Sequence, residues 1–432
     1  LWRCLVPFLH ERLPNGLDVV AETSEAAVST SVGFFVMTGA RDERPGIEGV
    51  SHFLEHMVFK GPPGLSAEEI NRSFDRIGAA ANAFTSEEDT VYHACVLPRY
   101  QADAVELLAR MMRPELRADD FDLEKKVILE EIRMYDDQPP FGADDRCRAA
   151  YFGKHPLAAS VLGTIESIEA LDVEAMRDYY RRRYAPGTMV LVASGAVDFA
   201  ALVESARRLC SDWEPQPLTA RGQPDQPRAA ALPGVERIVR PAAALEYAVR
   251  LTPGPGENDS DRWAAGLLAV VLGDGSGSRL YWSLVDPGLA EQATLGHQDF
   301  LDAGLFVTQL SCEADEVDEL LARISDTYTE AIRGGIPAAE FEQARNKVAG
   351  RVVLAGERPR RRLFDVGLEW AHFRRFRSVA DTLQIVESLT LDDIHRVLAA
   401  WPLDAPSATV LAGPAEEAGS GSRASALPRG EA

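Results

Sequence analysis

Hydrophobic positions in the first half of the chain change between the two-residue spacing of strands and the three-to-four-residue spacing of helices. Residues 11–22 predict two strands joined by a turn at Pro14-Asn15-Gly16, and the β-branched and aromatic run 28–37 predicts a buried strand. Residues 79–97 predict two strands around a polar turn, and 188–193 a further strand. Helical spacing is found in the segment that ends at Gly61 and at 66–77, 101–113, 119–135, 143–152, 173–184 and 199–209.

The pattern repeats in the second half, after a stretch rich in Pro, Gly and Gln that has a linker composition. A strand, a polar loop and a helix follow one another at Tyr247–Leu251, Pro253–Ser260 and Arg262–Leu272. The same order is predicted earlier, from the strand at 28–37 through the loop at 38–46 to the helix before Gly61. We therefore predict an α+β fold of two tandem related domains, each a mainly antiparallel sheet packed with helices.

The predicted boundaries follow from these composition changes. The N-terminal domain is expected to cover residues 1–213, the linker 214–235 and the related C-terminal domain 236–413. Residues 414–432 are of low complexity and are expected to form a disordered tail.

Composition narrows the possible partners and location. The formal net charge of −22 disfavours nucleic acid and anionic membranes as partners. No apolar run approaches the roughly 18 residues that a membrane span needs. The five cysteines are scattered and form no C-x-x-C pair, which argues against a disulfide framework and favours a reducing compartment. The cytoplasm is the expected location, with the periplasm left open.

One short motif carries candidate metal chemistry, in the segment Gly49-Val50-Ser51-His52-Phe53-Leu54-Glu55-His56-Met57-Val58-Phe59-Lys60-Gly61. Residues four apart lie on one face of a helix, so His52 and His56 can direct both imidazoles at one Zn²⁺ ion. Glu55 shares that face and can reach a metal-bound water. The pattern is the inverted zinc-peptidase motif H-x-x-E-H. Buried histidines that only satisfy hydrogen bonds are the alternative.

A catalytic zinc site normally has three protein ligands, so a third must come from elsewhere. The helix predicted at 119–135 offers Glu124, Glu130 and Glu131. Glu124 and Glu131 are two turns apart and share one face, whereas Glu130 is rotated by about 100° from Glu131. We expect the apolar face of this helix to lie beside the two carboxylates and to consist of Leu123, Val127 and Ile128. Solvated surface glutamates are the alternative.

The first 200 residues resemble the pitrilysin, insulinase and mitochondrial processing peptidase family of zinc metalloendopeptidases. The resemblance lies in G-V-S-H-F-L-E-H-M-V-F-K-G, A-N-A-F-T-S, E-K-K-V-I-L-E-E-I-R-M-Y and V-L-G-T-I-E-S-I. The family has a glutamate ligand some 75 residues after the second histidine, and here 74 residues separate His56 from Glu131. The resemblance therefore implies one Zn²⁺ per chain held by His52, His56 and Glu131, with Glu55 as general base and Glu124 as a supporting acid.

The resemblance also implies where substrate binds. Residues 81–85 match the family's edge strand, to which a peptide adds as an extra strand. The implied substrate-binding residues are Ala81, Asn82, Ala83, Phe84 and Thr85. The implied activity is metal-assisted hydrolysis of peptides or short unfolded chains inside a two-subunit chamber.

The second half departs from the family pattern. Family members that bind substrate through this half carry an arginine and, farther on, a tyrosine, where this chain has Val285 and Glu291. Our hypothesis is a heterodimer in which this chain is the catalytic subunit and a homologous partner supplies the Arg/Tyr pair. A homodimer, a non-catalytic assembly subunit and a processing subunit dedicated to one peptide precursor are the alternatives.

Overall fold

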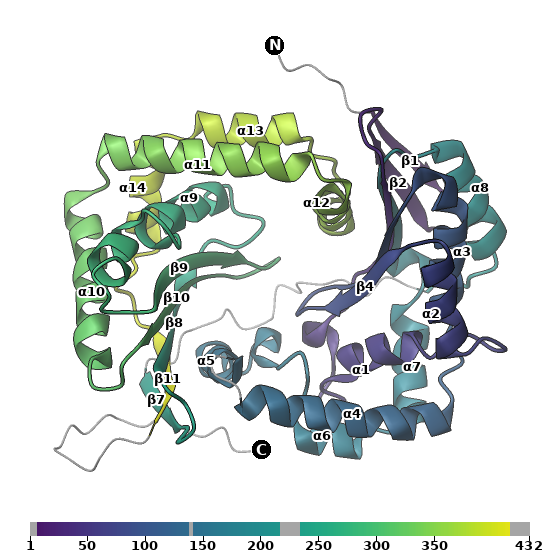
Figure 1. The fold of residues 1–432 in the computed structure, drawn as a ribbon, viewed down its shortest axis with the longest axis horizontal. Coiled ribbons are helices and arrows are strands. Elements are labelled where there is room, and N and C mark those ends of the chain that lie inside the picture. Colours follow the sequence, from purple (N-terminus) through teal and green to yellow (C-terminus); the bar gives the residue numbers. More distant parts are fainter. Residues whose placement is uncertain (1–6, 138–140, 217–233, 415–432) are drawn as a thin grey trace. The chain divides into compact units, whose positions relative to one another are not determined.

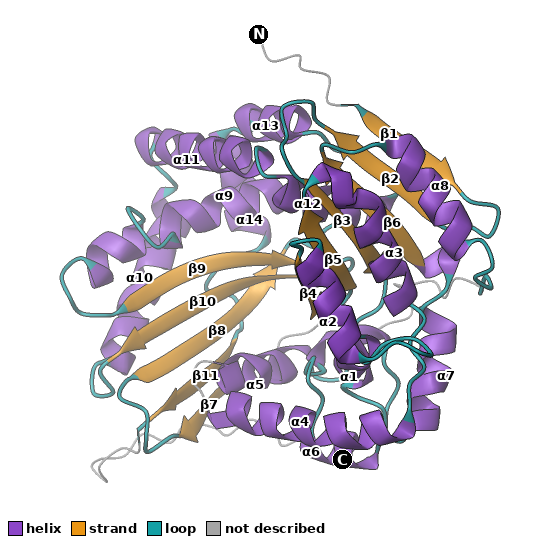
Figure 2. Cartoon of the chain, turned by 45° about the vertical axis from the view of Figure 1, so that its right-hand side comes forward, coloured by secondary structure: helices purple, strands orange, loops and turns teal. Residues whose placement is uncertain are grey.

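The structure is a computed structural model that describes residues 7–137, 141–216 and 234–414. Most of the predicted linker and nearly all of the predicted tail lie outside the described residues. The rest of the chain consists of helices and strands in a mixed order, with five helices in succession before the last strand (Figure 2).

The first sheet, which Figure 1 shows with β1, β2 and β4 labelled, has six strands in the order β1-β2-β6-β3-β5-β4, all labelled in Figure 2. Its strands are β1 (Phe8–Arg12), β2 (Asp18–Thr23), β3 (Thr30–Val36), β4 (Ala80–Thr85), β5 (Thr90–Val96) and β6 (Met189–Gly195). All neighbours are antiparallel except β2 and β6. β4 pairs with β5 alone in the described part of the chain, so its other side is a free edge.

Helices cover both faces of this sheet, which explains why β3 is buried along its whole length. Phe34 of β3 faces Trp213, which follows α8, whereas Phe35 faces Phe364 of α12 on the opposite side. The helices α1 (Val50–Val58), α3 (Gln101–Met111), α8 (Phe199–Cys210) and α12 (Pro359–Phe373) contact the strands of this sheet. The other helices of this part of the fold are α2 (Ala67–Arg76), α4 (Ala118–Asp137), α6 (Ile165–Ala170) and α7 (Val173–Arg183).

The second sheet has five strands in the order β7-β11-β8-β10-β9, with β7 and β11 parallel and the others antiparallel. Its strands are β7 (Gly234–Val239), β8 (Glu246–Gly254), β9 (Gln292–Asp299), β10 (Gly304–Cys312) and β11 (Ala408–Gly413). The remaining helices are α5 (Phe141–Phe152), α9 (Arg262–Gly273), α10 (Val317–Gly334), α11 (Ala338–Gly356), α13 (Val379–Ser388) and α14 (Leu391–Ala400).

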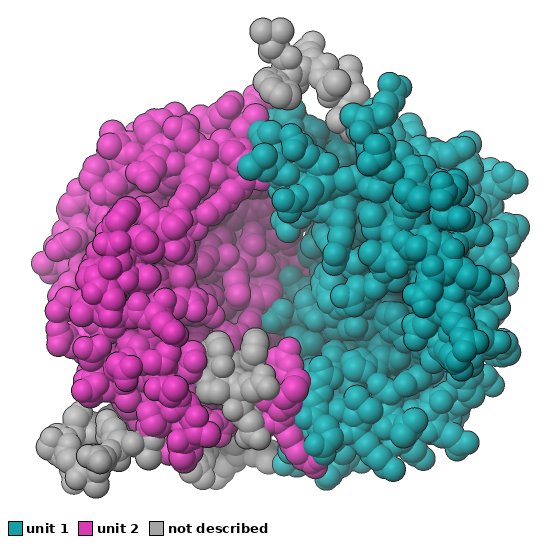
Figure 3. Space-filling view, in the orientation of Figure 1, with its two compact units in different colours: residues 1–132, 159–221, 352–382 teal, residues 133–158, 222–351, 383–432 magenta. Residues whose placement is uncertain are grey.

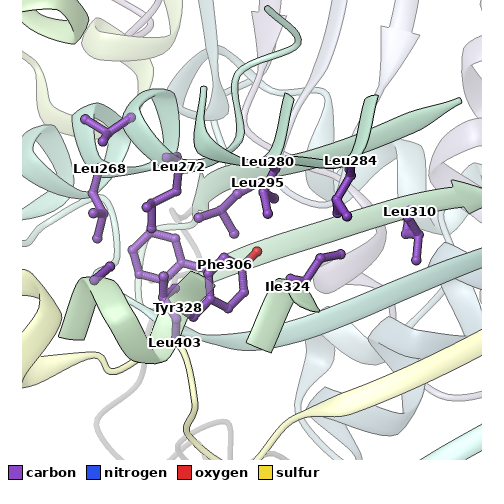
Figure 4. Close-up of a cluster of buried hydrophobic side chains, with 14 of the residues drawn as sticks. Leu268, Leu272, Leu280, Leu284, Leu295, Phe306, Leu310, Ile324, Tyr328 and Leu403 are labelled. Atoms are coloured by element: carbon purple, nitrogen blue, oxygen red, sulfur yellow. The ribbon is translucent and has the colours of Figure 1, made fainter. Parts of the chain in front are cut away.

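The core of the second sheet lies between its strands and the helices α9, α10 and α14. Figure 4 shows Leu268 and Leu272 of α9 near Phe306 of β10 and Tyr328 of α10. The Tyr328 hydroxyl is satisfied inside this core by Thr308 Oγ1, 2.8 Å away. Two sheets with their own helix-covered cores confirm the predicted α+β class.

Each sheet belongs to a compact unit built from three segments of chain (Figure 3). Unit 1 comprises residues 1–132, 159–221 and 352–382, and unit 2 comprises 133–158, 222–351 and 383–432. An ion pair joins the segment 352–382 to the rest of unit 1. Arg362 of α12 donates two hydrogen bonds, of 2.6 and 3.0 Å, to Glu22 of β2 within unit 1.

None of the helices in the described ranges is both long enough and apolar enough to cross a bilayer.

Candidate metal centre

The helix α1 is anchored in the core by the apolar residues that neighbour His52 and His56 in the sequence. Phe53, Leu54, Met57 and Val58 are fully buried. The Phe53 ring stacks on Phe121 of α4, with ring centroids 4.6 Å apart. This contact packs α1 against α4, so the polar faces of the two helices meet at one place.

At that place the structure brings His52, His56 and Glu131 together. Each offers one ligand atom, and the three atoms lie within 4.8 Å of one another. Glu131 Oε1 is 3.9 Å from His52 Nε2, and Glu131 Oε2 is 3.7 Å from His56 Nε2. In the described ranges no other group of three or more His, Cys, Asp or Glu side chains has metal-binding geometry.

The donor set fits a zinc ion. Two imidazoles and one carboxylate match catalytic zinc sites, which leave a fourth position for water or substrate. Bonds of about 2.0–2.1 Å to a tetrahedral ion place neighbouring ligand atoms about 3.3 Å apart. The two separations from Glu131 are 3.7 and 3.9 Å, and all three ligand atoms lie within 4.8 Å, so the spacing is somewhat wider than that around a bound ion.

His52 is in the protonation state that a metal ligand needs. Burial, together with the nearby His56, lowers its pKa to about 3, so the imidazole is neutral at physiological pH. Its Nδ1 atom is buried and has no hydrogen-bond partner among the described residues. No carboxylate therefore orients the Nδ1 side of His52 among the described residues.

His56 is oriented by a carboxylate instead. Its Nδ1 lies 2.9 Å from Glu124 Oε1, which leaves Nε2 directed at the candidate metal position. The other oxygen of Glu124 forms an ion pair with Lys60. The hydrogen bond to His56 and the contact with Lys60 lower the pKa of Glu124 to about 2, so it is a carboxylate throughout the physiological range.

Lys60 is a residue that sequence reasoning missed. It stands four residues after His56, so the helical spacing that paired His52 with His56 could also have placed Lys60 near this face. Lys60 follows the end of α1, and its role depends on Glu124 of α4.

Glu55 lies beside the ligands and is held from the edge strand. Thr85 Oγ1 of β4 donates a 2.6 Å hydrogen bond to Glu55 Oε2. Burial raises the pKa of Glu55, while the Thr85 hydrogen bond opposes the rise. A partly desolvated carboxylate next to a metal position is suited to accept a proton from a water bound there.

One expectation about α4 is wrong. Leu123 and Val127 do not flank the carboxylates on a buried face, since their side chains are 59% and 46% exposed. The buried face consists of Phe121, Ile128 and Ile132, and the site face lies beside it. Glu124 is buried and Glu131 partly buried because the core face of α4 continues around that side of the helix.

The predicted substrate residues all lie on the edge strand β4. Their exposure alternates, with Asn82 and Phe84 more exposed than Ala81, Ala83 and Thr85. Thr85 differs from the other four because its hydroxyl reaches Glu55. The strand thus presents an unpaired backbone edge that ends at the candidate centre.

Within unit 2, Val285 and Glu291 stand where the sequence comparison with the family expects an arginine and a tyrosine. Val285 ends a short helical turn that begins at Tyr281, and Glu291 is an exposed residue just before β9. The helix α9, which follows the repeated strand and loop, carries no histidine or glutamate.

Two family models match the chain. "Insulinase (Peptidase family M16)" matches residues 18–165, and "Peptidase M16 inactive domain" matches residues 170–348. The first match contains all the residues of the candidate centre.

Similar proteins cover nearly the whole chain. An "uncharacterized zinc protease" of Mycobacterium tuberculosis is 33% identical over 89% of this chain and 88% of its own length. A protein of the same description from Bacillus subtilis is 30% identical over 90% of this chain and 91% of its own length.

Solved structures show the same fold. A protease from Helicobacter pylori has a TM-score of 0.87 at 23% identity, covering 95% of this chain and 100% of its own. An M16-like peptidase from Alicyclobacillus acidocaldarius has a TM-score of 0.84 at 23% identity, covering 95% of this chain and 98% of its own. Taken with the relative of 33% identity and the two matching family models, these results show that the chain belongs to peptidase family M16, the insulinase family.

Proposed function

We propose that this protein is a zinc-dependent endopeptidase whose single catalytic Zn²⁺ is held by His52, His56 and Glu131. The observation that carries the proposal is the convergence of these three ligands with Glu55, whose carboxylate is held beside them by Thr85. The bacterial relatives are named as zinc proteases, which supports the choice of metal and reaction.

The chain's own residues divide the chemistry. When bound, zinc supplies a Lewis acid that polarises the scissile carbonyl and lowers the pKa of water. Glu55 accepts the proton of the attacking water and then delivers it to the leaving amine. Glu124 keeps the Nδ1 proton of His56 in place, so that Nε2 remains a ligand.

The substrate class follows from the edge of β4. An extended peptide can pair with this edge through main-chain hydrogen bonds, which bind many sequences with low specificity. Only extended segments can add to a sheet edge in this way, so peptides and short unfolded chains are the proposed substrates. Residues 81–85 would carry this pairing and would lead the scissile bond to Glu55.

A peptide library tests the activity. Wild-type protein and Glu55→Gln are incubated with a mixture of random peptides, and the products are identified by mass spectrometry. The wild type should cleave many sequences, whereas Glu55→Gln should cleave them at least about a thousandfold more slowly, because the proton acceptor is lost. Equal cleavage by both proteins would overturn the enzymatic proposal. Cleavage of a single sequence would instead favour a processing enzyme dedicated to one precursor.

We further propose that a homologous second subunit supplies an arginine and a tyrosine for substrate binding. The support is local to unit 2, where Val285 and Glu291 offer neither group. A homodimer is the alternative. Size-exclusion chromatography with activity assays separates them, since full activity of the purified chain as a monomer or homodimer would contradict the heterodimer.

A further inference from the structure

The N-terminus of the metal-binding helix α1 has no cap of its own. A helix begins with unpaired backbone N–H groups, which an Ser, Thr, Asp or Asn side chain usually satisfies from the N-cap position. The N-cap of α1 is Gly49, which has no side chain, and the first turn of the helix carries no acidic residue.

Gly49 cannot be replaced by a capping residue. Its backbone adopts a φ of +87°, and a Cβ atom there would lie 2.5 Å from the carbonyl oxygen of Leu162 and 2.9 Å from Cα of Gly163. The close approach of these two loops requires glycine. Any cap for α1 must therefore come from outside the helix.

Glu43 provides that cap from the preceding loop. Its Oε2 accepts a hydrogen bond of 2.7 Å from the Gly49 N–H, and its Oε1 accepts one of 2.7 Å from the Ser51 N–H. Both side-chain oxygens of Glu43 thus accept hydrogen bonds from backbone N–H groups, one and three residues before His52. The Ser51 hydroxyl lies 2.7 Å from the Tyr179 hydroxyl, which anchors the same turn to α7.

The loop that carries Glu43 also holds the strand that orients Glu55. The N–H groups of Ala40 and Arg41 donate to the carbonyl oxygens of Ser86 and Glu87, in the turn that follows β4. Arg41 also forms a buried ion pair with Glu88. The turn begins directly after Thr85, whose hydroxyl bonds to Glu55 on α1. Residues 40–43 thus connect the N-terminus of α1 to the strand that contacts its catalytic glutamate.

We propose that Glu43 is a positioning residue that sets the placement of α1, and with it His52, His56 and Glu55, relative to Glu131 and Thr85. A merely stabilising cap would leave zinc affinity and turnover unchanged in the folded protein. A positioning role predicts that both worsen in step with the number of acceptors removed. This inference rests on the proposed function, but zinc binding and hydrogen exchange test it without peptide cleavage.

The experiment uses a graded series and a matched control on the full chain. Glu43→Gln keeps one acceptor oxygen, whereas Glu43→Met has a similar length and keeps none. The control is Glu69→Met, which removes a carboxylate from the capping box of the neighbouring helix α2. Zinc affinity is measured by competition with a chelator, α1 amide exchange by mass spectrometry, and kcat and KM with a peptide that the wild type cleaves.

The expected losses of zinc affinity and kcat are about tenfold for Glu43→Gln and about a hundredfold for Glu43→Met, the range that follows removal of hydrogen-bond partners that orient metal ligands. KM should stay within about twofold, since ground-state binding of the peptide is not touched. Amides at the start of α1 should exchange faster in both variants. Glu69→Met should behave as wild type in zinc affinity and kcat.

Wild-type zinc affinity in Glu43→Met would overturn the proposal whatever its α1 amide exchange, as would an equal loss of zinc affinity in Glu69→Met. If Glu43→Met does not fold, Glu43→Gln decides by the same measurements. If the wild type cleaves no peptide, the proposed function fails, while zinc affinity and exchange still decide the role of Glu43.

Discussion

Thr85, the last residue of the edge strand β4, donates a 2.6 Å hydrogen bond to the carboxylate of Glu55 on α1. The contact joins the proposed substrate-binding edge to the proposed proton acceptor. A peptide that pairs with β4 would therefore extend toward the carboxylate that acts on it.

Replacing Thr85 should impair proton transfer by Glu55 without affecting zinc binding. Thr85→Ala removes a hydrogen bond to a carboxylate, a loss of about 1.5–3 kcal/mol, and kcat should fall at least about tenfold while zinc content stays the same. Thr85→Ser keeps the hydroxyl and should remain within about threefold of wild type. Steady-state kinetics check this. Equal activity of Thr85→Ala and wild type, or equal loss in both variants, would show that the hydroxyl does not support Glu55.

The Lys60–Glu124–His56 contacts predict a graded effect on zinc. Glu124→Gln should weaken zinc binding by about 10- to 100-fold, because it no longer accepts the Nδ1 proton of His56 with a full charge. Lys60→Met should weaken binding less, since it acts through Glu124. Lys126→Met is the control, at an exposed lysine of α4, the helix that carries Glu124. A chelator competition assay measures all three, and a loss in the control equal to that of Lys60→Met would contradict a specific role for Lys60.

The assignment of Glu131, rather than the adjacent Glu130, as the third zinc ligand can be tested by replacing each in turn. Glu131→Gln should lower zinc affinity by at least about a hundredfold because one of three ligands is weakened. Glu130→Gln should keep wild-type affinity, since Glu130 is an exposed residue on another face of α4. Metal analysis of both purified variants decides. Retention of zinc by Glu131→Gln, or loss of zinc from Glu130→Gln, would show that Glu131 is not the ligand.

His93 predicts an acid-sensitive core in unit 1. It is 2% exposed and packs edge-on against Phe364, and burial lowers its pKa to about 4. Below about pH 6.5, His93 is protonated in the unfolded chain but remains neutral in the folded chain. The free energy of unfolding therefore falls as the pH drops from 6.5 toward 4.

The variant His93→Phe tests this directly, since it keeps the aromatic contact and cannot titrate. Between pH 7 and pH 5 the wild type should lose about 1–2 kcal/mol more unfolding free energy than the variant. Urea unfolding at both pH values provides the measurement. Equal losses would show that His93 is not the group responsible.

Local patterns predicted most of the elements in the first half of the chain, together with β8 and α9 in the second. The turn at Pro14-Asn15-Gly16, the capping box Ser66–Glu69 and the helix α1 lie where short-range spacing places them. The sequence also brought Glu124 and Glu131 to one face of α4, because seven residues make two helical turns.

Longer-range relationships could not be predicted in this way. Periodicity shows that a helix has a buried face but not which sheet covers it, so the placement of α12 on the first sheet was not foreseen. The same limit led to the wrong buried face for Leu123 and Val127. Glu43 was missed because its partners, the N–H groups of Gly49 and Ser51, lie in the backbone, where side-chain motifs give no signal.

Zinc removal and return is the measurement that tests the account most directly. The protein is stripped of metal with a chelator, and peptide cleavage is followed as Zn²⁺ is added back in known amounts. The account predicts that cleavage is abolished by removal, rises in proportion to added zinc and stops rising at one zinc per chain, and that zinc-loaded Glu55→Gln stays inactive. Full cleavage by the zinc-free protein, or by zinc-loaded Glu55→Gln, would contradict it.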